Sequence, residues 1–335
     1  GPGRLGYAVS VSTAGRTTTE ALESLREDGG RNFDARTYLR ERLLDTYLGT
    51  VDDSPDQWRW TWNGPDGHWT PEPRDRERAF AKYDGVLAGL ARGTIPAFVN
   101  FGEGYQEQLG VMAYQRTLDR QLLSLLDWPV WDSVTSEFEA ALTDSVIAAA
   151  VAQLPPEYLA GGASFLAAGL RARRDLLPKA AQGLYRLINQ EAAFFGTPGA
   201  DTVTVTRMQD GALELAFQDG FRRVYAPGES DAVALYLGGG ADRINLAGPG
   251  RAGPILDVAW HPGLTLAGAR GSGQRTKVYG GGPRTGGMRL DIVPDTLPVP
   301  EVEDLDLTRP PPVPLHGTDA RPIFWFDVNS DVGIL

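Results

Sequence analysis

The stretch from Leu43 to Asp84 reads LLDTYLGTVDDSPDQWRWTWNGPDGHWTPEPRDRERAFAKYD and holds the densest set of chemically capable groups in the chain. A proline and three aspartates fall in residues 50–57, which predicts a loop. The alternation of apolar and polar residues in Trp58–Trp62 predicts a strand, and residues 68–71 return as its partner across a turn at 63–67. We therefore expect a carboxylate-rich loop followed by a tryptophan-rich hairpin.

Helical patterns surround this stretch on both sides. Asp34 is a predicted N-cap and Gly49 a predicted C-terminal stop for an amphipathic helix. Its apolar face contains Leu39, Leu43, Leu44, Tyr47 and Leu48. Further helices are expected at 19–28, 114–123, 133–142 and 143–154, then a short helix at Pro156 and an antiparallel pair at 163–177 and 180–195, broken near Pro178.

Near Gly196 the pattern changes to short alternating strands separated by glycine and proline. The expected strands are 203–206, 213–217, 233–237, 243–246 and 256–260. The high glycine content of residues 238–287 is typical of tight turns in a small sheet or a solenoid stack. Residues 294–314 are rich in proline and are expected to form a semi-extended linker, and the aromatic tail at 324–335 has the alternation of a strand.

The predicted fold class is therefore α+β. We expect a mainly helical domain at 1–197 that carries the hairpin, a glycine-rich β module at 198–293, and a linker with a lead-in to a further domain at 294–335. The sequence begins Gly-Pro-Gly and stops at Leu335 in mid-pattern, so we expect the chain to be part of a longer protein.

Composition excludes several classes of function. The net charge of −11 and a pI near 4.9 argue against binding to nucleic acid or to anionic lipid, because both need clustered lysine and arginine. The chain has no cysteine, so disulfides, thiolate metal sites and cysteine nucleophiles are excluded. Its three histidines lie far apart in sequence, which disfavours a histidine-rich metal site. No motif of a P-loop, a dinucleotide fold, a serine hydrolase or a zinc protease is present.

Several segments together resemble a domain of bacterial outer-membrane proteins. These segments are 34–45, 56–60, 73–80, 142–156, 171–177, 238–244 and 329–335. The similar proteins join a periplasmic metallophosphoesterase-like region to a surface-antigen barrel of the BamA type. The resemblance implies a location on the periplasmic side of the outer membrane, membrane contact through a barrel that this sequence does not include, and other envelope proteins or that barrel as partners.

The same domain is similar to the C-terminal lobe of atypical kinases such as the HipA, CotH and phosphoinositide-kinase groups. In those proteins a helix ends in a Gly-Asp-x-Asp-Arg-His type loop, and a later aspartate holds metal. The resemblance places Asp52 at the loop acid and Asp75 at the metal-holding acid, whereas Asp53 and Ser54 stand where arginine and histidine are expected. Since the upstream residues are also too few for an N-lobe with its lysine, a complete kinase site is not expected in this chain.

Two interpretations of Asp52, Asp56 and Asp75 follow. Hard carboxylate oxygens are suited to Mg²⁺, so Asp52 could act in phosphoryl transfer while Asp75 and Asp56 hold the metal. Alternatively, the acids are paired with nearby arginines and have a structural role, which we favour because ion-pair networks of this kind are usually structural. For the tryptophans of the hairpin, core packing is favoured over a stacking platform.

The glycine-rich segment Gly238–Ile244 has some likeness to calcium-binding nonapeptide turns, which need stacked copies. The nearest second copy in that comparison, at 271–274, lacks the aspartate, so a plain turn in a sheet is favoured. Three functional hypotheses result: a non-catalytic structural or interaction domain of an outer-membrane protein, an atypical Mg²⁺-dependent phosphotransferase whose N-lobe lies upstream, and a scaffold subunit of a cell-envelope complex whose aromatic tail docks as a strand.

Overall fold

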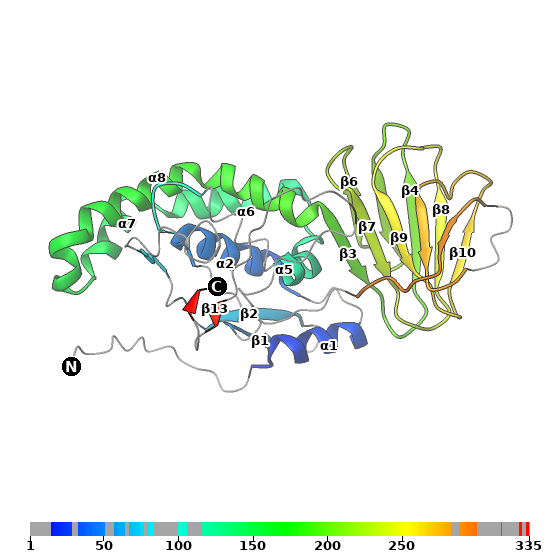
Figure 1. Cartoon of the computed structure of the whole chain (residues 1–335), viewed down its shortest axis with the longest axis horizontal. Coiled ribbons are helices and arrows are strands. Elements are labelled where there is room, and N and C mark those ends of the chain that lie inside the picture. The colour runs from blue at the N-terminus through cyan, green and yellow to red at the C-terminus, as the bar shows by residue number, and fades with distance from the viewer. Residues whose placement is uncertain are drawn as a thin grey trace.

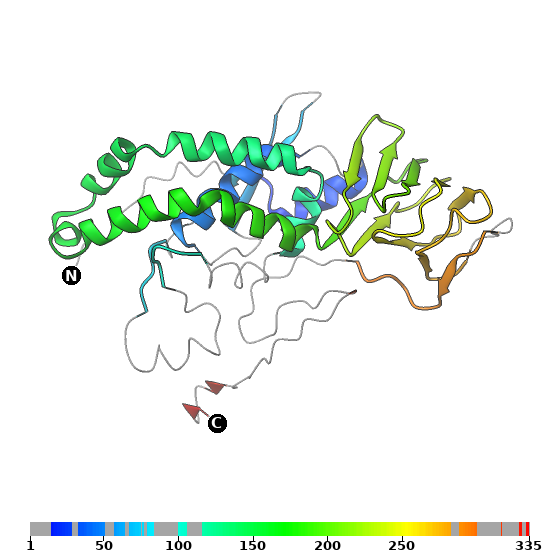
Figure 2. The same cartoon turned by 90° about the horizontal axis from the view of Figure 1, so that it is seen from above.

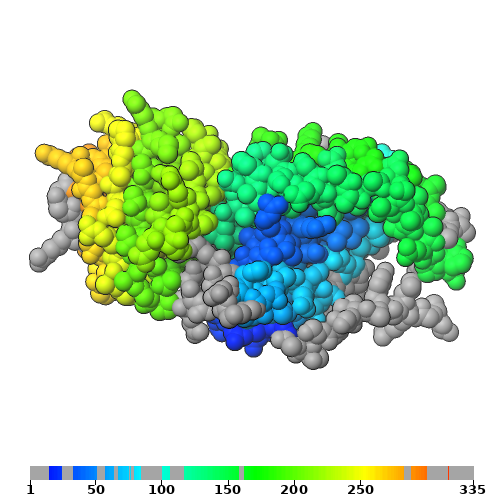
Figure 3. All heavy atoms as spheres, turned by 180° about the vertical axis from the view of Figure 1, so that it is seen from behind, coloured from blue at the N-terminus to red at the C-terminus, as the bar shows by residue number. Residues whose placement is uncertain are grey.

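The computed structural model describes residues 15–28, 33–50, 57–63, 67–74, 76, 79–83, 100–105, 116–282, 288–299, 316, 328–329 and 333–334. As predicted, the fold is mixed α+β: a helical body and a β module lie next to each other along the longest axis of the molecule (Figure 1). The space-filling view shows the two parts in direct contact (Figure 3).

The helical body is built mainly from α-helices, the longest of which run antiparallel to each other. The described helices are α1 (Thr18–Asp28), α2 (Ala35–Leu48), α5 (Arg116–Leu123), α6 (Trp128–Ala141), α7 (Asp144–Ala152) and α8 (Pro156–Asn189). Helix α8 packs along α6 and α7, and α2 packs against both α6 and α8 (Figure 2). The apolar residues that these helices share form one core, which includes Leu43, Leu122, Trp131, Leu184 and Ile188.

Helix α2 confirms the prediction made from its sequence. The Asp34 side chain accepts a hydrogen bond from the backbone N–H of Thr37, which caps the first turn. Gly49 ends the helix in the left-handed region at φ 77°, and its N–H donates to the carbonyl of Asp45. The C-terminal end of α2 therefore leads directly into the acidic loop.

The tryptophan hairpin also forms, with β1 (Trp58–Trp62) antiparallel to β2 (Trp69–Pro73). Trp58 and Trp60 are buried, and both rings contact Tyr38 of α2. Trp60 also donates its indole N–H to the Thr18 hydroxyl at 3.0 Å, whereas Trp62, at the end of the strand, is 38% exposed. Core packing is therefore confirmed for Trp58, Trp60 and Trp69, which is also buried in this core, and it is wrong for Trp62.

The predicted break near Pro178 is wrong. Helix α8 runs without interruption from Pro156 to Asn189, and its residues on both sides of the proline, such as Leu177 and Ala181, are fully buried. Burial of this face outweighs the roughly 3 kcal/mol that an interior proline costs a helix. The predicted helix at 180–195 ends earlier than expected, because residues 191–195 form the first strand of the β module.

The β module is a stack of parallel coils, one of the two arrangements that its glycine content suggested. Its strands are β3 (Glu191–Phe195), β4 (Thr202–Arg207), β5 (Leu213–Phe217), β6 (Arg222–Tyr225), β7 (Ala232–Tyr236), β8 (Arg243–Ala247), β9 (Ile255–Ala259), β10 (Thr265–Gly268), β11 (Thr276–Tyr279) and β12 (Asp291–Val293). One sheet has the order β12-β11-β9-β7-β3 and is wholly parallel; the other has the order β10-β8-β4-β5-β6. From β6 to β11 successive strands alternate between the two sheets, whereas β11 and β12 belong to the same sheet. Strands β5 and β6 form an antiparallel insertion in the first coil.

The inner faces of the two sheets bury a second apolar core, which includes Phe194, Val205, Leu235, Ile244 and Val258. Successive turns approach each other closely: a Cβ atom at Gly263 would lie 1.8 Å from the carbonyl oxygen of Gly240. Only glycine fits at such a contact. In the tail, Val328–Asn329 (β13) pairs with Gly333–Ile334 (β14), in the region where the alternation predicted a strand.

Candidate functional site

The predicted site residues Asp52, Asp56 and Asp75 lie outside the residues that the structure describes. The structure does describe the chain next to two of them. The N–H of Thr50 donates to the carbonyl of Asp45, and the side chain of Arg76 donates to the carboxylate of the same residue. Thr50 and Arg76, which are close in sequence to Asp52 and Asp75, therefore both contact Asp45 in the last turn of α2.

A buried network of ion pairs is centred on this helix end. One carboxylate oxygen of Asp45 accepts from Arg76 at 2.7 Å, and the other lies 3.3 Å from a guanidinium nitrogen of Arg42. Arg76 also pairs with Glu41 at 2.6 Å. Burial opposes the charge on Arg76, but the two acids outweigh it and the pKa of Arg76 is raised. Both carboxylate oxygens of Asp45 are therefore engaged by cations of the protein.

Asp119 of α5 completes the network. Arg42 donates to its two carboxylate oxygens at 3.0 and 3.1 Å, and the hydroxyl of Tyr38 donates at 2.9 Å. The side chains of Arg42 and Asp119 are each 1% exposed. A two-pronged pair of this kind fixes both position and orientation, so it ties α5 to α2 inside the core.

Arg173 of α8 holds the same helix end from the other side. Its guanidinium group donates to the backbone carbonyls of Thr46 and Tyr47, the last turn of α2, at 2.5 and 2.8 Å. It also donates to the carbonyls of Gly102 and Gly104. A cation is favourable at the C-terminal end of a helix because the carbonyl dipoles converge there. Burial lowers the pKa of Arg173 to about 10, so the group is still charged at neutral pH.

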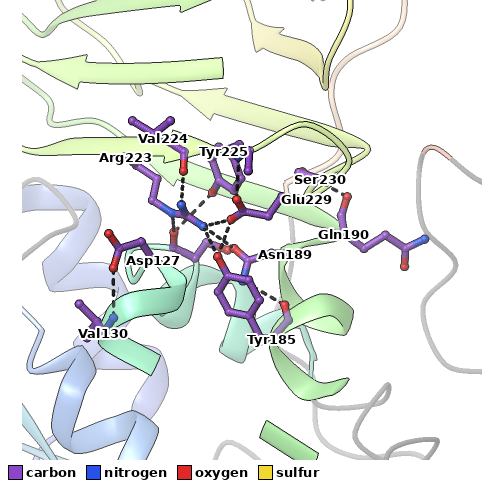
Figure 4. Close-up of polar contacts among 12 residues, drawn as sticks. Asp127, Val130, Tyr185, Asn189, Gln190, Arg223, Val224, Tyr225, Glu229 and Ser230 are labelled. Atoms are coloured by element: carbon purple, nitrogen blue, oxygen red, sulfur yellow. Dashed lines mark hydrogen bonds and ion pairs between the residues drawn. The ribbon is translucent and has the colours of Figure 1, made fainter. Parts of the chain in front are cut away.

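A second buried cluster joins the helical body to the β module, and its centre is Arg223 of β6 (Figure 4). Its guanidinium group donates to Glu229 at 2.5 Å, to the hydroxyl of Tyr185 at 3.0 Å and to the side-chain oxygen of Asn189 at 3.3 Å. It also donates to the carbonyl of Ser124 at 3.2 Å. Three of these partners belong to the helical body, so one β-strand residue connects both parts of the protein.

The groups around Arg223 stabilise its positive charge. Burial opposes the charge on Arg223, but Tyr225, Tyr185 and Glu229 outweigh it, so the pKa of the guanidinium group is raised. Burial also raises the pKa of Tyr185, whose hydroxyl donates to Glu229. Arg223 therefore keeps its charge, and Tyr185 keeps the proton that it donates, over the whole physiological pH range.

A hollow of about 290 Å³ opens next to this cluster. It is lined by Trp128, Gln182, Tyr185, Arg186, Gln190, Gly228, Glu229 and Asp231, so it offers an aromatic surface, amide groups and charges of both signs. Its volume is at the lower limit for small-molecule pockets. The arrangement is suited to holding a polar side chain or a short peptide segment and offers no evident nucleophile.

The glycine-rich segment at 238–244 is a turn of the coil stack. One oxygen of Asp242 accepts from the N–H of Asp201 at 2.7 Å, and the other lies 2.8 Å from Nε2 of His261. The neighbouring turns are therefore the upstream one that ends at Asp201 and the downstream one that contains His261 and Gly263, and not residues 271–274. Among the described residues, no group of three or more histidine, aspartate or glutamate side chains is arranged to hold a metal ion.

Sequence reasoning did not predict the four described arginines that are buried, which are Arg42, Arg173, Arg207 and Arg223. Arg173 lies in the segment Arg171–Arg174, where a cluster of basic residues looks like an ordinary solvated helix face. Arg223 lies in β6, where two arginines precede two apolar residues, so no alternation is visible. None of the described helices combines the length and apolar character needed to span a membrane. Comparisons of the chain with protein-family models, with curated proteins and with solved structures found no match.

Proposed function

We propose that this chain is a non-catalytic structural or interaction domain of a bacterial cell-envelope protein, on the periplasmic side of the outer membrane. The observation that carries the proposal is the closed ion-pair network at the end of α2. A cation site needs carboxylate oxygens that are available to the metal. The oxygens of Asp45 and Asp119 are instead taken by Arg42 and Arg76.

The joint between the two parts of the molecule supports a mechanical role. Only Gln190 separates the end of α8 from the start of β3, so no flexible linker lies between them. Arg223 then cross-links the parts through buried hydrogen bonds to Tyr185, Asn189 and Ser124. A rigid, elongated body of this kind is suited to holding neighbouring domains or partner proteins at a fixed distance.

The partners in this proposal are other envelope proteins and a barrel domain that follows the chain. The hollow lined by Trp128, Glu229 and Asp231 is the surface best suited to such a contact, since it offers stacking, amide and charged groups together. The resemblance to outer-membrane proteins supports the location, and fractionation of cells that produce the whole protein tests it.

The test of the non-catalytic role is calorimetric titration of the chain with Mg²⁺ and ATP. We expect no binding tighter than the millimolar range, and no difference between the parent chain and Asp75→Ala. Asp132→Ala, on the exposed face of α6, is the matched control for loss of one negative charge. Tight binding that disappears in Asp75→Ala and persists in Asp132→Ala would overturn the proposal.

One observation favours a second candidate, an atypical Mg²⁺-dependent phosphotransferase with a kinase-like C-terminal lobe. Thr50 and Arg76, which are close in sequence to Asp52 and Asp75, both contact Asp45 at the end of α2. In this candidate Asp52 orients the acceptor, while Asp75 and Asp56 hold the metal. A longer protein with the upstream sequence should then transfer phosphate from ATP, and Asp52→Asn should abolish the transfer without changing the melting temperature.

A further inference from the structure

Arg207, the last residue of β4, is a buried cation at the edge of the β module. It follows Val203 and Val205 on the inner face of the strand and is 3% exposed. Its Nη1 donates to the carbonyls of Ala252 and Pro254 at 2.9 and 2.8 Å. Among the described residues, no carboxylate forms an ion pair with it. A buried charge is costly unless another group offsets it, so this arginine lacks a counter-ion.

One edge of the Arg207 guanidinium group is open. The two nitrogens of this edge, Nε and Nη2, donate to none of the residues that the structure describes. Solvent reaches both of them, because neither belongs to the fully buried atoms without a partner. Arg42 uses the same two nitrogens to bind both oxygens of Asp119, at 3.0 and 3.1 Å. Arg207 therefore presents, on a fixed side chain, the donor pair that binds two oxygens of one anion.

Arg275, which directly precedes β11, brings a second positive charge close to Arg207. Its carbonyl accepts from the N–H of Leu256 at 2.9 Å, which places it beside the start of β9, the strand that Pro254 precedes. Arg275 is exposed and has a left-handed backbone at φ 56°, which is unusual for a residue other than glycine or asparagine. Burial and then the charge of Arg275 lower the pKa of Arg207 to about 10, so Arg207 is still charged at neutral pH.

The surrounding turns of the coil stack are rich in arginine. The turns at 208–212, 248–254 and 269–275 follow one another along this edge of the module. The first two are in contact, because a Cβ atom at Gly253 would lie 2.0 Å from the carbonyl oxygen of Gly211. Besides Arg275, the charged residues of these turns are Arg251, Arg270 and Asp210, all exposed. The edge is therefore locally basic in a chain whose net charge is −11.

The chemistry of the two guanidinium groups selects the class of anion. A carboxylate has two oxygens, and the open edge of Arg207 would bind both. A phosphate group has further oxygens, which are left for Arg275. We propose that Arg207 and Arg275 form a binding site for a phosphate group at this edge of the β module. The phosphate is either the free anion or the end of a larger molecule, and it supplies the counter-ion that Arg207 lacks. This inference does not rest on the proposed function.

Thermal melting of the whole chain in sodium phosphate at pH 7.5 tests the site, with the ionic strength held constant by sodium chloride. Two charge-assisted contacts correspond to a dissociation constant of about 1–5 mM. A ligand that binds only the folded state stabilises it, so the melting temperature should rise by about 2–5 °C from zero to about 50 mM phosphate and approach saturation. Sodium acetate is the control for charge alone, and its effect should be less than about half as large. No rise in phosphate, or an equal rise in acetate, would overturn the proposal.

Glycerol 3-phosphate distinguishes the two sources of the phosphate group. A dissociation constant for the ester at least roughly tenfold below that for inorganic phosphate assigns the site to the phosphate of a larger molecule. An equal or higher constant assigns it to the free anion. Phosphate binding should be the same in Asp75→Ala, which separates this edge from the magnesium site considered above.

Arg275→Asn is the deciding variant, because the residue is exposed and asparagine tolerates its left-handed backbone. It should weaken phosphate binding by roughly tenfold, the effect of one charge-assisted contact. Arg243→Gln removes the same charge from an exposed position at the opposite end of β8 and should change the dissociation constant by less than about twofold. Arg207→Lys keeps the charge but loses the open edge, so it should also bind phosphate roughly tenfold more weakly. If Arg275→Asn binds phosphate as tightly as the parent, or Arg243→Gln loses binding to the same extent, the proposal is wrong.

Discussion

The replacement of Arg223 by methionine tests how the helical body and the β module are held together. Methionine keeps most of the side-chain volume and removes every donor of the guanidinium group. The substitution leaves Glu229, the hydroxyl of Tyr185 and the carbonyl of Ser124 without the hydrogen bonds that Arg223 supplies. The cluster is buried, so water replaces these bonds poorly.

The size of the effect follows from these contacts. Removal of one partner of a buried ion pair costs about 3–5 kcal/mol. Since the Glu229 side chain is 14% exposed and rehydrates in part, we take the lower end, about 3 kcal/mol. Glu229→Gln keeps an acceptor and loses the charge, so it should cost about 1–2 kcal/mol. The double variant removes both charges together and should cost less than the sum by at least about 1 kcal/mol.

The assay is urea denaturation of the four proteins, followed by tryptophan fluorescence and by far-ultraviolet circular dichroism. Of the eight tryptophans, six belong to the helical body, Trp260 belongs to the β module and Trp325 lies outside the described residues, so the fluorescence mainly reports the helical body. We expect one coincident transition in the parent and separated transitions in Arg223→Met. If the two single changes add within about 0.5 kcal/mol, or if the transitions of Arg223→Met stay coincident, the reasoning fails.

Three further predictions follow from contacts elsewhere in the molecule. Arg173→Met should lower the free energy of unfolding by about 3–5 kcal/mol, because four carbonyls lose their donor, and a loss under 1 kcal/mol in urea denaturation would contradict this. Burial raises the pKa of Asp242 above 3.8, so the folded state takes up a proton before the unfolded state does, and this residue increases the free energy of unfolding as the pH falls. Asp242→Asn should remove this contribution. If the free energy of unfolding of the variant depends on acidic pH with the same slope as that of the parent, the prediction is contradicted. Gly263→Ala should cost more than about 2 kcal/mol through the clash with Gly240, whereas Gly239→Ala, with no atom within 4 Å of its Cβ, should be nearly neutral in thermal melting.

Local patterns predicted much of the fold. The caps of α2 were recognisable because Asp34 and Gly49 act through their own chain neighbours. Five of the ten described strands of the β module were predicted for a similar reason, since alternation and glycine punctuation are visible in sequence. The parallel coil arrangement was only one of two options, because strand partners up to 41 residues apart, such as Glu191 and Ala232, leave no trace in a local pattern.

Tertiary packing explains why the predictions for Pro178 and for residues 191–195 were wrong. Pro178 is a strong local signal for a break, but the helix on both sides of it is fixed by burial against the core. Residues 191–195 have a composition that suits a helix, and they become a strand because β7 provides the partner. The site is a similar case. Nothing in the sequence distinguishes Arg173 or Arg223 from exposed arginines, since their partners are mostly backbone carbonyls and distant side chains.

The coil stack gives the β module an adjustable length. Each coil adds one strand to the wholly parallel sheet, and neighbouring strands of a sheet are about 4.8 Å apart. Insertion or deletion of one coil, for example β9 with β10, would therefore lengthen or shorten the module by a single step and leave the attachment of β3 and β6 to the helices unchanged. In related chains that differ by whole coils, the distance between the helical body and the far end of the β module would then change in steps of one strand spacing.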